Sequence, residues 1–163
     1  MKKILLTLAA TFIFCVGTGY AAPINYMATG QTAVGIGTDT FFLKHKFSDG
    51  FTLGYQSIDL DHGYDSDDIY GDFALSRNVG LIVGARDFDS ETDAYVGVGV
   101  HAPLAPKWDG YAFAIGCGDF KEMQVGANFM MTGNLDLNLY YRSFQPDLGD
   151  NQNKFGAAVT YIF

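Results

Sequence analysis

The chain has 163 residues, enough for one domain, and a formal net charge of −8 that argues against nucleic acid as a partner. Its 20 glycines, 15% aromatic residues and 17% charged residues are typical of a glycine-rich β protein and exclude an ordinary helical bundle. After residue 21 no stretch reaches the roughly 18 apolar residues of a spanning helix, so any membrane span there must be built of strands.

The first 21 residues have the pattern of a secretory signal peptide. Lys2 and Lys3 form a basic start, residues 4–16 are apolar, and small residues stand at positions 19 and 21, before Ala22. The apolar stretch is shorter than the roughly 20 residues of a spanning helix. We therefore predict a cleaved signal peptide over 1–21 and a single domain over 22–163.

Ten segments of the remaining chain show the period-two alternation of β-strands. In chain order they are 31–37, 41–47, 51–55, 69–75, 81–85, 94–102, 110–118, 122–131, 135–144 and 154–163. Bacterial outer-membrane barrels have an even number of strands. The pattern predicts an all-β fold, a small antiparallel up-and-down transmembrane β-barrel of ten strands, or of eight if the two weakest N-terminal strands are dropped.

The two faces of these strands differ in composition. One face is apolar, which suits lipid; in 110–118 this face consists of Tyr111, Phe113, Ile115 and Cys117. The other face mixes glycine and alanine with isolated charges, which suits a narrow lumen better than the solvated face of a soluble β-sandwich, the alternative fold. We predict a lumen ion-pair network of Lys44, Asp72, Arg86, Glu122, Asp136, Arg142 and Lys154.

The connections between the strands test this topology. Short periplasmic turns are expected at 48–50, 77–79 and 132–134, and a longer connection at 103–109 departs from the rule. Outward connections fall at 37–39, 60–67, 89–93, 119–121 and 145–153. The chain ends on an aromatic residue, and this ending resembles the last strand of bacterial outer-membrane barrels, which the barrel-assembly machinery reads. The resemblance implies that Tyr161 and Phe163 form an assembly signal.

An acidic segment follows the third expected strand. Asp59, Asp61, Asp65, Asp67 and Asp68 offer the oxygen ligands that calcium prefers, but the spacing does not match an EF-hand, and a solvated loop explains it as well. A second acidic segment, 87–93, is expected on the same rim. The two could share divalent cations with lipopolysaccharide phosphates, which makes lipopolysaccharide and membrane lipid the expected surface partners.

Two active functions are weaker alternatives. His62 lies among Asp59, Asp61 and Asp65, and an aspartate-oriented histidine can act as a general base in a rim hydrolase. A loop with this many aspartates contains aspartate–histidine pairs by chance. We therefore expect that the protein is not an enzyme and has no catalytic residue or cofactor. A narrow pore is the other alternative, although barrels of about eight strands are filled by side chains. The expected role is structural or interaction-based, and the oligomeric state stays open.

The whole mature chain resembles the YfaZ-type family of small proteobacterial outer-membrane proteins. The likeness rests on residues 80–86, 110–114, 135–142 and 161–163, which read GLIVGAR, GYAFA, LDLNLYYR and YIF. These are strand patterns without a catalytic signature. The resemblance implies a barrel in the outer membrane of a Gram-negative bacterium, with no established activity and no functional residues to carry over.

Overall fold

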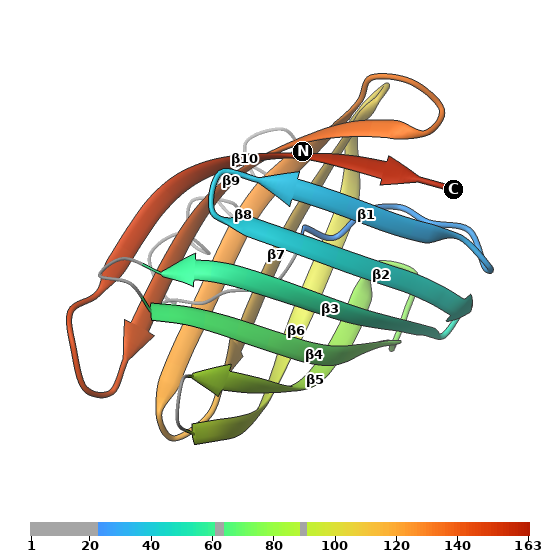
Figure 1. The fold of residues 1–163 in the computed structure, drawn as a ribbon. Coiled ribbons are helices and arrows are strands. Elements are labelled where there is room, and N and C mark those ends of the chain that lie inside the picture. The colour runs from blue at the N-terminus through green and yellow to red at the C-terminus, as the bar shows by residue number, and fades with distance from the viewer. Residues whose placement is uncertain (1–22, 61–63, 89–90) are drawn as a thin grey trace, which may run out of the picture.

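The computed structural model describes residues 23–60, 64–88 and 91–163, and these form one closed antiparallel barrel (Figure 1). Its ten strands are β1 (Thr32–Gly37), β2 (Thr40–Ser48), β3 (Phe51–Leu60), β4 (Tyr64–Ala74), β5 (Val79–Phe88), β6 (Glu91–Ala105), β7 (Trp108–Gly116), β8 (Phe120–Met130), β9 (Leu135–Pro146) and β10 (Gln152–Ile162). Each strand pairs with its sequence neighbours, and β1 closes the barrel against β10. The ten-strand prediction is confirmed, and the eight-strand alternative is wrong. The expected signal peptide lies outside the described residues.

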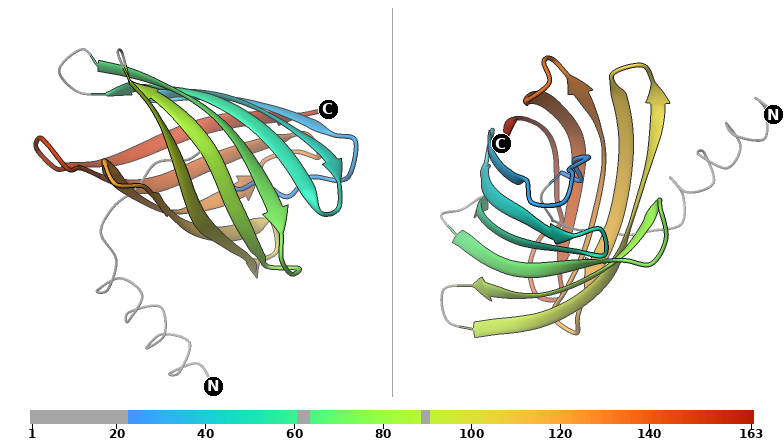
Figure 2. Two further views of the ribbon diagram at one scale, coloured as in Figure 1. Left: turned by 90° about the horizontal axis from the view of Figure 1, so that it is seen from below. Right: turned by 90° about the vertical axis from the view of Figure 1, so that its right-hand side faces the viewer.

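The two ends of the barrel differ, and we name them by what lies there. The terminal end carries the start of β1 and the end of β10, where Thr32 and Phe163 exchange backbone hydrogen bonds of 2.8 and 2.9 Å. It also carries the turns at 49–50, 75–78, 106–107 and 131–134. The loop end carries connections that include 38–39, 117–119 and 147–151. Figure 2 shows the tilted strands running between these two ends. We call the corresponding parts of the lumen the terminal half and the loop half.

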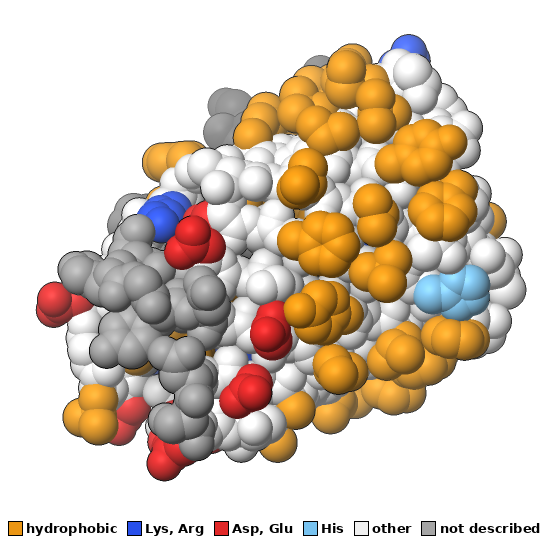
Figure 3. Space-filling model, in the orientation of Figure 1, with side chains coloured by type: hydrophobic (Ala, Val, Ile, Leu, Met, Phe, Trp, Pro, Cys, Tyr) orange, Lys and Arg blue, Asp and Glu red, His pale blue; other side chains and the backbone are white. Residues whose placement is uncertain are grey.

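The outer surface is apolar over much of its height. Exposed outward side chains include Ile69, Leu75, Val96, Val98 and Leu139. On the face in Figure 3, hydrophobic side chains gather toward the terminal end and acidic ones toward the loop end. Among the described residues no helix is long and apolar enough to cross a membrane. An apolar exterior around a polar interior is the arrangement of a transmembrane barrel.

Glycines on the inner faces make room for large aromatic rings. Each ring lies directly across from a glycine of the neighbouring strand, where an added Cβ would meet the ring; the pairs are Gly35–Phe42, Gly54–Tyr70, Gly84–Tyr95, Gly126–Tyr111 and Gly156–Tyr140. A side chain on such a glycine would displace the ring, because ring atoms already occupy the place that its Cβ would take. The glycines therefore allow the aromatic rings to fill the lumen.

The expected orientation of the seventh strand is wrong. Tyr111, Phe113 and Ile115 are buried inside the barrel, and the small residues of β7 face outward. The register explains this, because Ile115 lies opposite Gly97 and Phe113 opposite Gly99 on β6. Large side chains occupy the side on which neighbouring strands carry glycine. Cys117 is half-buried beside the lumen cluster and does not face lipid from a strand.

The expected long connection at 103–109 is also wrong. β6 runs to Ala105 and β7 begins at Trp108, so only two residues form the turn. Lys107 adopts a positive φ of 69° there, and the pairing register shifts between Pro103 and Ala105. A bulge accepts a proline because one residue leaves the hydrogen-bond ladder at that point. The turn thus obeys the short-turn rule of the terminal end.

Candidate functional site

The loop half of the lumen is filled by a cluster centred on Arg86. Its guanidinium forms two hydrogen bonds with Asp68, of 2.6 Å from Nε and 2.7 Å from the terminal nitrogen, and an ion pair with Glu122. Gln56 donates a 2.7 Å hydrogen bond to the same Asp68 carboxylate. All four side chains are almost completely buried and come from β3, β4, β5 and β8. One cation therefore holds two carboxylates in the interior.

Four aromatic rings surround this guanidinium. The centroids of Phe120, Phe88, Tyr95 and Phe144 lie 4.6, 5.7, 5.7 and 5.9 Å from its central carbon. A planar cation is attracted to ring faces at such distances. We call Gln56, Asp68, Arg86 and Glu122 with these four rings the Arg86 cluster. It spans the lumen from β3 to β9 and leaves the loop half packed with side chains.

A second ion cluster lies at the loop end, on Asp39 between β1 and β2. Arg142 donates to both carboxylate oxygens of Asp39, at 2.6 and 3.2 Å, and Lys154 lies 3.8 Å away. The Tyr140 hydroxyl donates a 3.1 Å hydrogen bond to the same carboxylate. Burial raises the pKa of Asp39, and the hydrogen bond and the charge of Lys154 offset this only in part. The contacts tie the β1–β2 turn to β9 and β10.

The terminal half of the lumen is occupied by the chain itself. Residues 23–29, which we call the N-terminal segment, precede β1 and enter the barrel, where Pro23 and Met27 are buried. The lumen side chains hold its backbone: Lys44 donates to the Pro23 carbonyl, Asn128 to that of Ile24 at 2.5 Å, and Lys46 to that of Met27 at 2.9 Å.

Side-chain contacts also hold the N-terminal segment. The Asn25 amide donates a 3.1 Å hydrogen bond to Asp136 and accepts one of 3.2 Å from Lys44. Thr29 donates a 2.7 Å hydrogen bond to Asp49 in the β2–β3 turn. Two cavities flank the segment, one of about 270 Å³ and one of about 130 Å³, and Tyr26 borders both.

The predicted lumen charges lie inside the barrel but do not form one network. Arg86 pairs with Glu122, whereas Arg142 and Lys154 contact Asp39. Lys44 faces Asp72 and Asp136 at longer range, and its hydrogen bonds go to the N-terminal segment. The structure thus divides the seven charges among three places, and it adds partners that the sequence pattern had not indicated.

The acidic segment is the clearest difference from the sequence interpretation. Asp68 is a buried lumen residue rather than a surface ligand, because β4 begins at Tyr64 and Asp68 shares the inward parity of Tyr70 and Asp72. Asp59 and Asp67 are exposed, and Asp67 accepts a 2.7 Å hydrogen bond from Tyr55. The hypotheses involving Asp61, His62 and the side chain of Asp65 lie outside the described residues.

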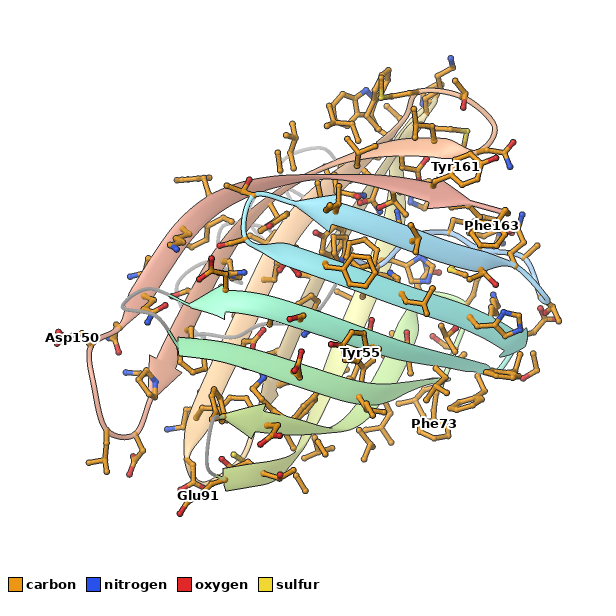
Figure 4. The ribbon with its side chains drawn as sticks, in the orientation of Figure 1. Tyr55, Phe73, Glu91, Asp150, Tyr161 and Phe163 are labelled. Carbon is orange, nitrogen blue, oxygen red and sulfur yellow. The ribbon has the colours of Figure 1, made fainter. Side chains whose placement is uncertain are left out.

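The two C-terminal aromatics lie on the outer surface at the terminal end. The rings of Tyr161 and Phe163 stack with centroids 5.9 Å apart, and both are exposed. Figure 4 shows them at the opposite end of the barrel from Glu91 and Asp150. Their placement leaves them accessible at the terminal end, while their role as an assembly signal stays a prediction.

One group of side chains in the described part of the chain has the geometry for a metal ion. Ligand atoms of Asp93, Cys117 and Asp119 lie within 4.8 Å of one another at the loop end. The backbone amide of Asp119 already donates a 3.4 Å hydrogen bond to the Cys117 sulfur. Exposed carboxylates gather at many strand ends without a metal, so we assign none here.

The fold and the filled lumen define the class: a small ten-stranded transmembrane β-barrel. No family model matches the chain, and no curated protein does. Among solved structures, a designed transmembrane β-barrel is 16% identical, with 84% of this chain and 98% of that chain covered and a TM-score of 0.42. The N-terminal barrel domain of Pseudomonas aeruginosa OprF is 10% identical (83% and 98% covered, TM-score 0.42), and the KdgM porin in complex with disordered oligogalacturonate is 12% identical (82% and 98% covered, TM-score 0.44).

Proposed function

We propose that this protein is an outer-membrane barrel of a Gram-negative bacterium with a closed lumen and a structural or interaction role at the cell surface. The observation that carries the proposal is the Arg86 cluster, which occupies the loop half with buried ion pairs and aromatic rings. A barrel filled in this way offers no continuous aqueous path. Its contribution to the envelope then comes from its outer surface and its loop end.

Planar-bilayer recording tests the closed lumen. Purified protein refolded into lipid is expected to give no steady single-channel steps. Heat-modifiable migration on a detergent gel, measured on the same sample, establishes that the inserted protein is a folded barrel. Steady conductance steps from such a sample would overturn the closed-lumen proposal. Sucrose-gradient fractionation of cell envelopes tests the location, since the protein is expected in the outer-membrane fraction.

A narrow pore for ions or small solutes is the second candidate. It is favoured by the N-terminal segment, which the lumen holds through hydrogen bonds to three carbonyl groups and which borders two cavities. Deletion of residues 23–29 joins these cavities. If the Arg86 cluster closes the barrel, the deletion variant stays silent in the bilayer; conductance that appears only in the variant identifies a gated pore.

At the loop end we propose contact with lipopolysaccharide through shared divalent cations. Asp67 and Asp87 lie directly opposite each other on β4 and β5 and are both exposed, so a cation between them would relieve their repulsion. Calcium titration of the detergent-refolded protein is expected to raise its melting temperature, and an Asp67→Asn/Asp87→Asn variant is expected to lose that rise. An equal response in both proteins would reject the proposal.

The C-terminal aromatics are proposed as the assembly signal read by the barrel-assembly machinery. Deletion of Phe163 is expected to lower the amount of heat-modifiable protein in the outer membrane without preventing refolding of purified protein in detergent.

The rim hydrolase rests on the sequence around His62 alone. Unchanged lipid and peptide profiles on expression of the wild type and of a His62→Ala variant would remove it.

A further inference from the structure

The N-terminal segment is held in the lumen in the way that a bound peptide is held. Residues 23–29 lie outside the ten strands, and in the described part of the chain the first backbone hydrogen bond to a strand is donated by Gly30, to the Lys46 carbonyl at 2.7 Å. Before Gly30, three carbonyl groups accept hydrogen bonds from lumen side chains of β2 and β8. Side chains that bind a backbone accept many sequences, because every residue carries a carbonyl group.

Two side chains of the segment add selectivity to these backbone contacts. The Asn25 amide donates to Asp136 on β9 and accepts from Lys44 on β2, so it uses partners on two different strands. Met27 is buried in a small apolar cluster with residues of β1 and β10. Tyr26, between them, is 72% exposed. The site therefore selects an amide at one position and an apolar side chain two residues further on.

The segment does not fill the space in which it lies. Cavities of about 270 and 130 Å³ flank it, and Tyr26 borders both. Close-packed protein interiors leave few voids larger than a water molecule. The terminal half therefore has room for side chains larger than those of this segment, which a site for more than one peptide requires.

Every strand pair of the barrel lies outside the segment. β1 begins at Thr32, after the segment has ended, and the loop half is held by side chains of the strands. Gly30 joins the segment to β1 with a φ of 86°, which glycine adopts without strain, and nothing lies within 4 Å of the place where a Cβ would stand. The segment can thus turn out of the lumen about Gly30 while the strands stay paired.

We propose that the terminal half of the lumen is a peptide-binding site, which the N-terminal segment occupies in this structure and which takes an extended segment of another protein when the N-terminal segment leaves. The ligand is a peptide with an asparagine-like amide at one position and an apolar side chain two residues further on. Turns of the terminal end border the larger cavity, so the peptide enters from that end. This function goes beyond the closed-lumen role and does not depend on whether the barrel conducts.

Calorimetric titration of a free peptide tests the proposal. The probe is the acetylated peptide of residues 23–29, PINYMAT, titrated into a variant that lacks these residues and into the full chain, both refolded in detergent. The variant is expected to bind it with a Kd on the order of 0.1 mM. The full chain is expected to bind it at least about tenfold more weakly, because its own segment occupies the site at a high effective concentration.

Three outcomes of this titration would overturn the proposal. Equal binding by both proteins would show that the peptide binds outside the lumen. No binding by the variant would show that the segment is not an exchangeable ligand. A variant that does not give heat-modifiable migration would show that the barrel depends on the segment for folding, so that the segment is part of the barrel core.

Variants of the peptide and of the barrel locate the contacts. Asn25→Ala in the peptide removes two hydrogen bonds and is expected to weaken binding at least about fivefold, whereas Tyr26→Ala, the matched control, is expected to change it less than about twofold. In the barrel, Lys46→Met removes the donor to the Met27 carbonyl, with an expected loss of about fivefold, and Lys107→Met in a turn of the same end is its control. Equal affinity for the two changed peptides would contradict binding at this site.

Discussion

The two halves of the lumen are closed by different means. In the loop half, side chains of β3, β4, β5 and β8 meet around Arg86, so the closure is part of the strand structure itself. In the terminal half, the N-terminal segment lies in the space and is held by side chains that reach its carbonyl groups. The loop half cannot open without breaking buried ion pairs, whereas the segment can leave without breaking any strand pair.

Charge divides the halves in the same way. Described charges near the terminal end balance, with Lys44, Lys46, Arg77 and Lys107 against Asp49, Asp72, Asp109 and Asp136. The outer surface of the loop end is acidic, with exposed Asp67, Asp87, Glu91, Asp147 and Asp150. Among the described residues the excess negative charge therefore lies at the loop end, where cations in the surrounding medium can reach it.

Removal of the central cation is expected to have the largest effect. Arg86→Met leaves Asp68 and Glu122 buried without their partner, and breaking a buried ion pair in this way costs about 3–5 kcal/mol. Urea unfolding in lipid vesicles measures the loss. The triple variant Arg86→Met, Asp68→Asn, Glu122→Gln is the control, since it removes the charges together and is expected to recover part of the stability. If the triple variant is less stable than Arg86→Met, the loss in Arg86→Met does not come from the unpaired charges of Asp68 and Glu122.

A disturbed aromatic–glycine pair is expected to lower the free energy of unfolding by less than the removal of Arg86 does. An added Cβ in Gly156→Ala would meet the Tyr140 ring, and overpacking of this kind costs about 1–3 kcal/mol. Gly133→Ala in the β8–β9 turn is the matched control, because nothing lies within 4 Å of its added Cβ. The same unfolding assay compares them, and equal stabilities would show that the ring yields without cost.

The N-terminal segment is expected to respond more weakly than the Arg86 cluster. Asn25→Ala removes one hydrogen bond to Asp136 and one from Lys44, with an expected loss of about 1 kcal/mol. Tyr26→Ala is its control, since Tyr26 is largely exposed and is expected to change the free energy of unfolding little. A loss as large as that of Arg86→Met would contradict the distinction between the two closures.

The alternation in the sequence was sufficient to predict strand number and, for most strands, the inner face. It failed at 110–118 because both faces of that segment are apolar or small, so hydrophobicity alone does not identify the inside. The structure shows that the neighbours decide: glycines on β6 and β8 admit Tyr111, Phe113 and Ile115. The inner face of this strand is therefore indicated by the glycines of its neighbours, and these can be matched to Tyr111, Phe113 and Ile115 only when the strand register is known.

Other parts of the site could not be predicted from the sequence, for different reasons. Asp68 stands at the same parity as Asp72, but its acidic neighbours resemble a loop, so the start of β4 was placed too late. Asp39 lies in a turn, where no periodicity marks a direction. The N-terminal segment shows no alternation. Three of its contacts are to backbone carbonyl groups, which are present whatever the side chains are, so the sequence gives no sign of them.

The smallest expected effect concerns the acidic exterior of the loop end. Asp67 and Asp87 form a directly opposed pair of like charges, which destabilises the two strands that carry them. Asp87→Asn is therefore expected to raise the melting temperature by about 1 °C in low salt without divalent cations, and the rise is expected to vanish near 1 M salt, where charges are screened. Asp150→Asn in the β9–β10 connection is the control and is expected to change nothing. With calcium present the sign is expected to reverse, because the variant removes a cation ligand; the same rise in both conditions would show that no cation is shared there.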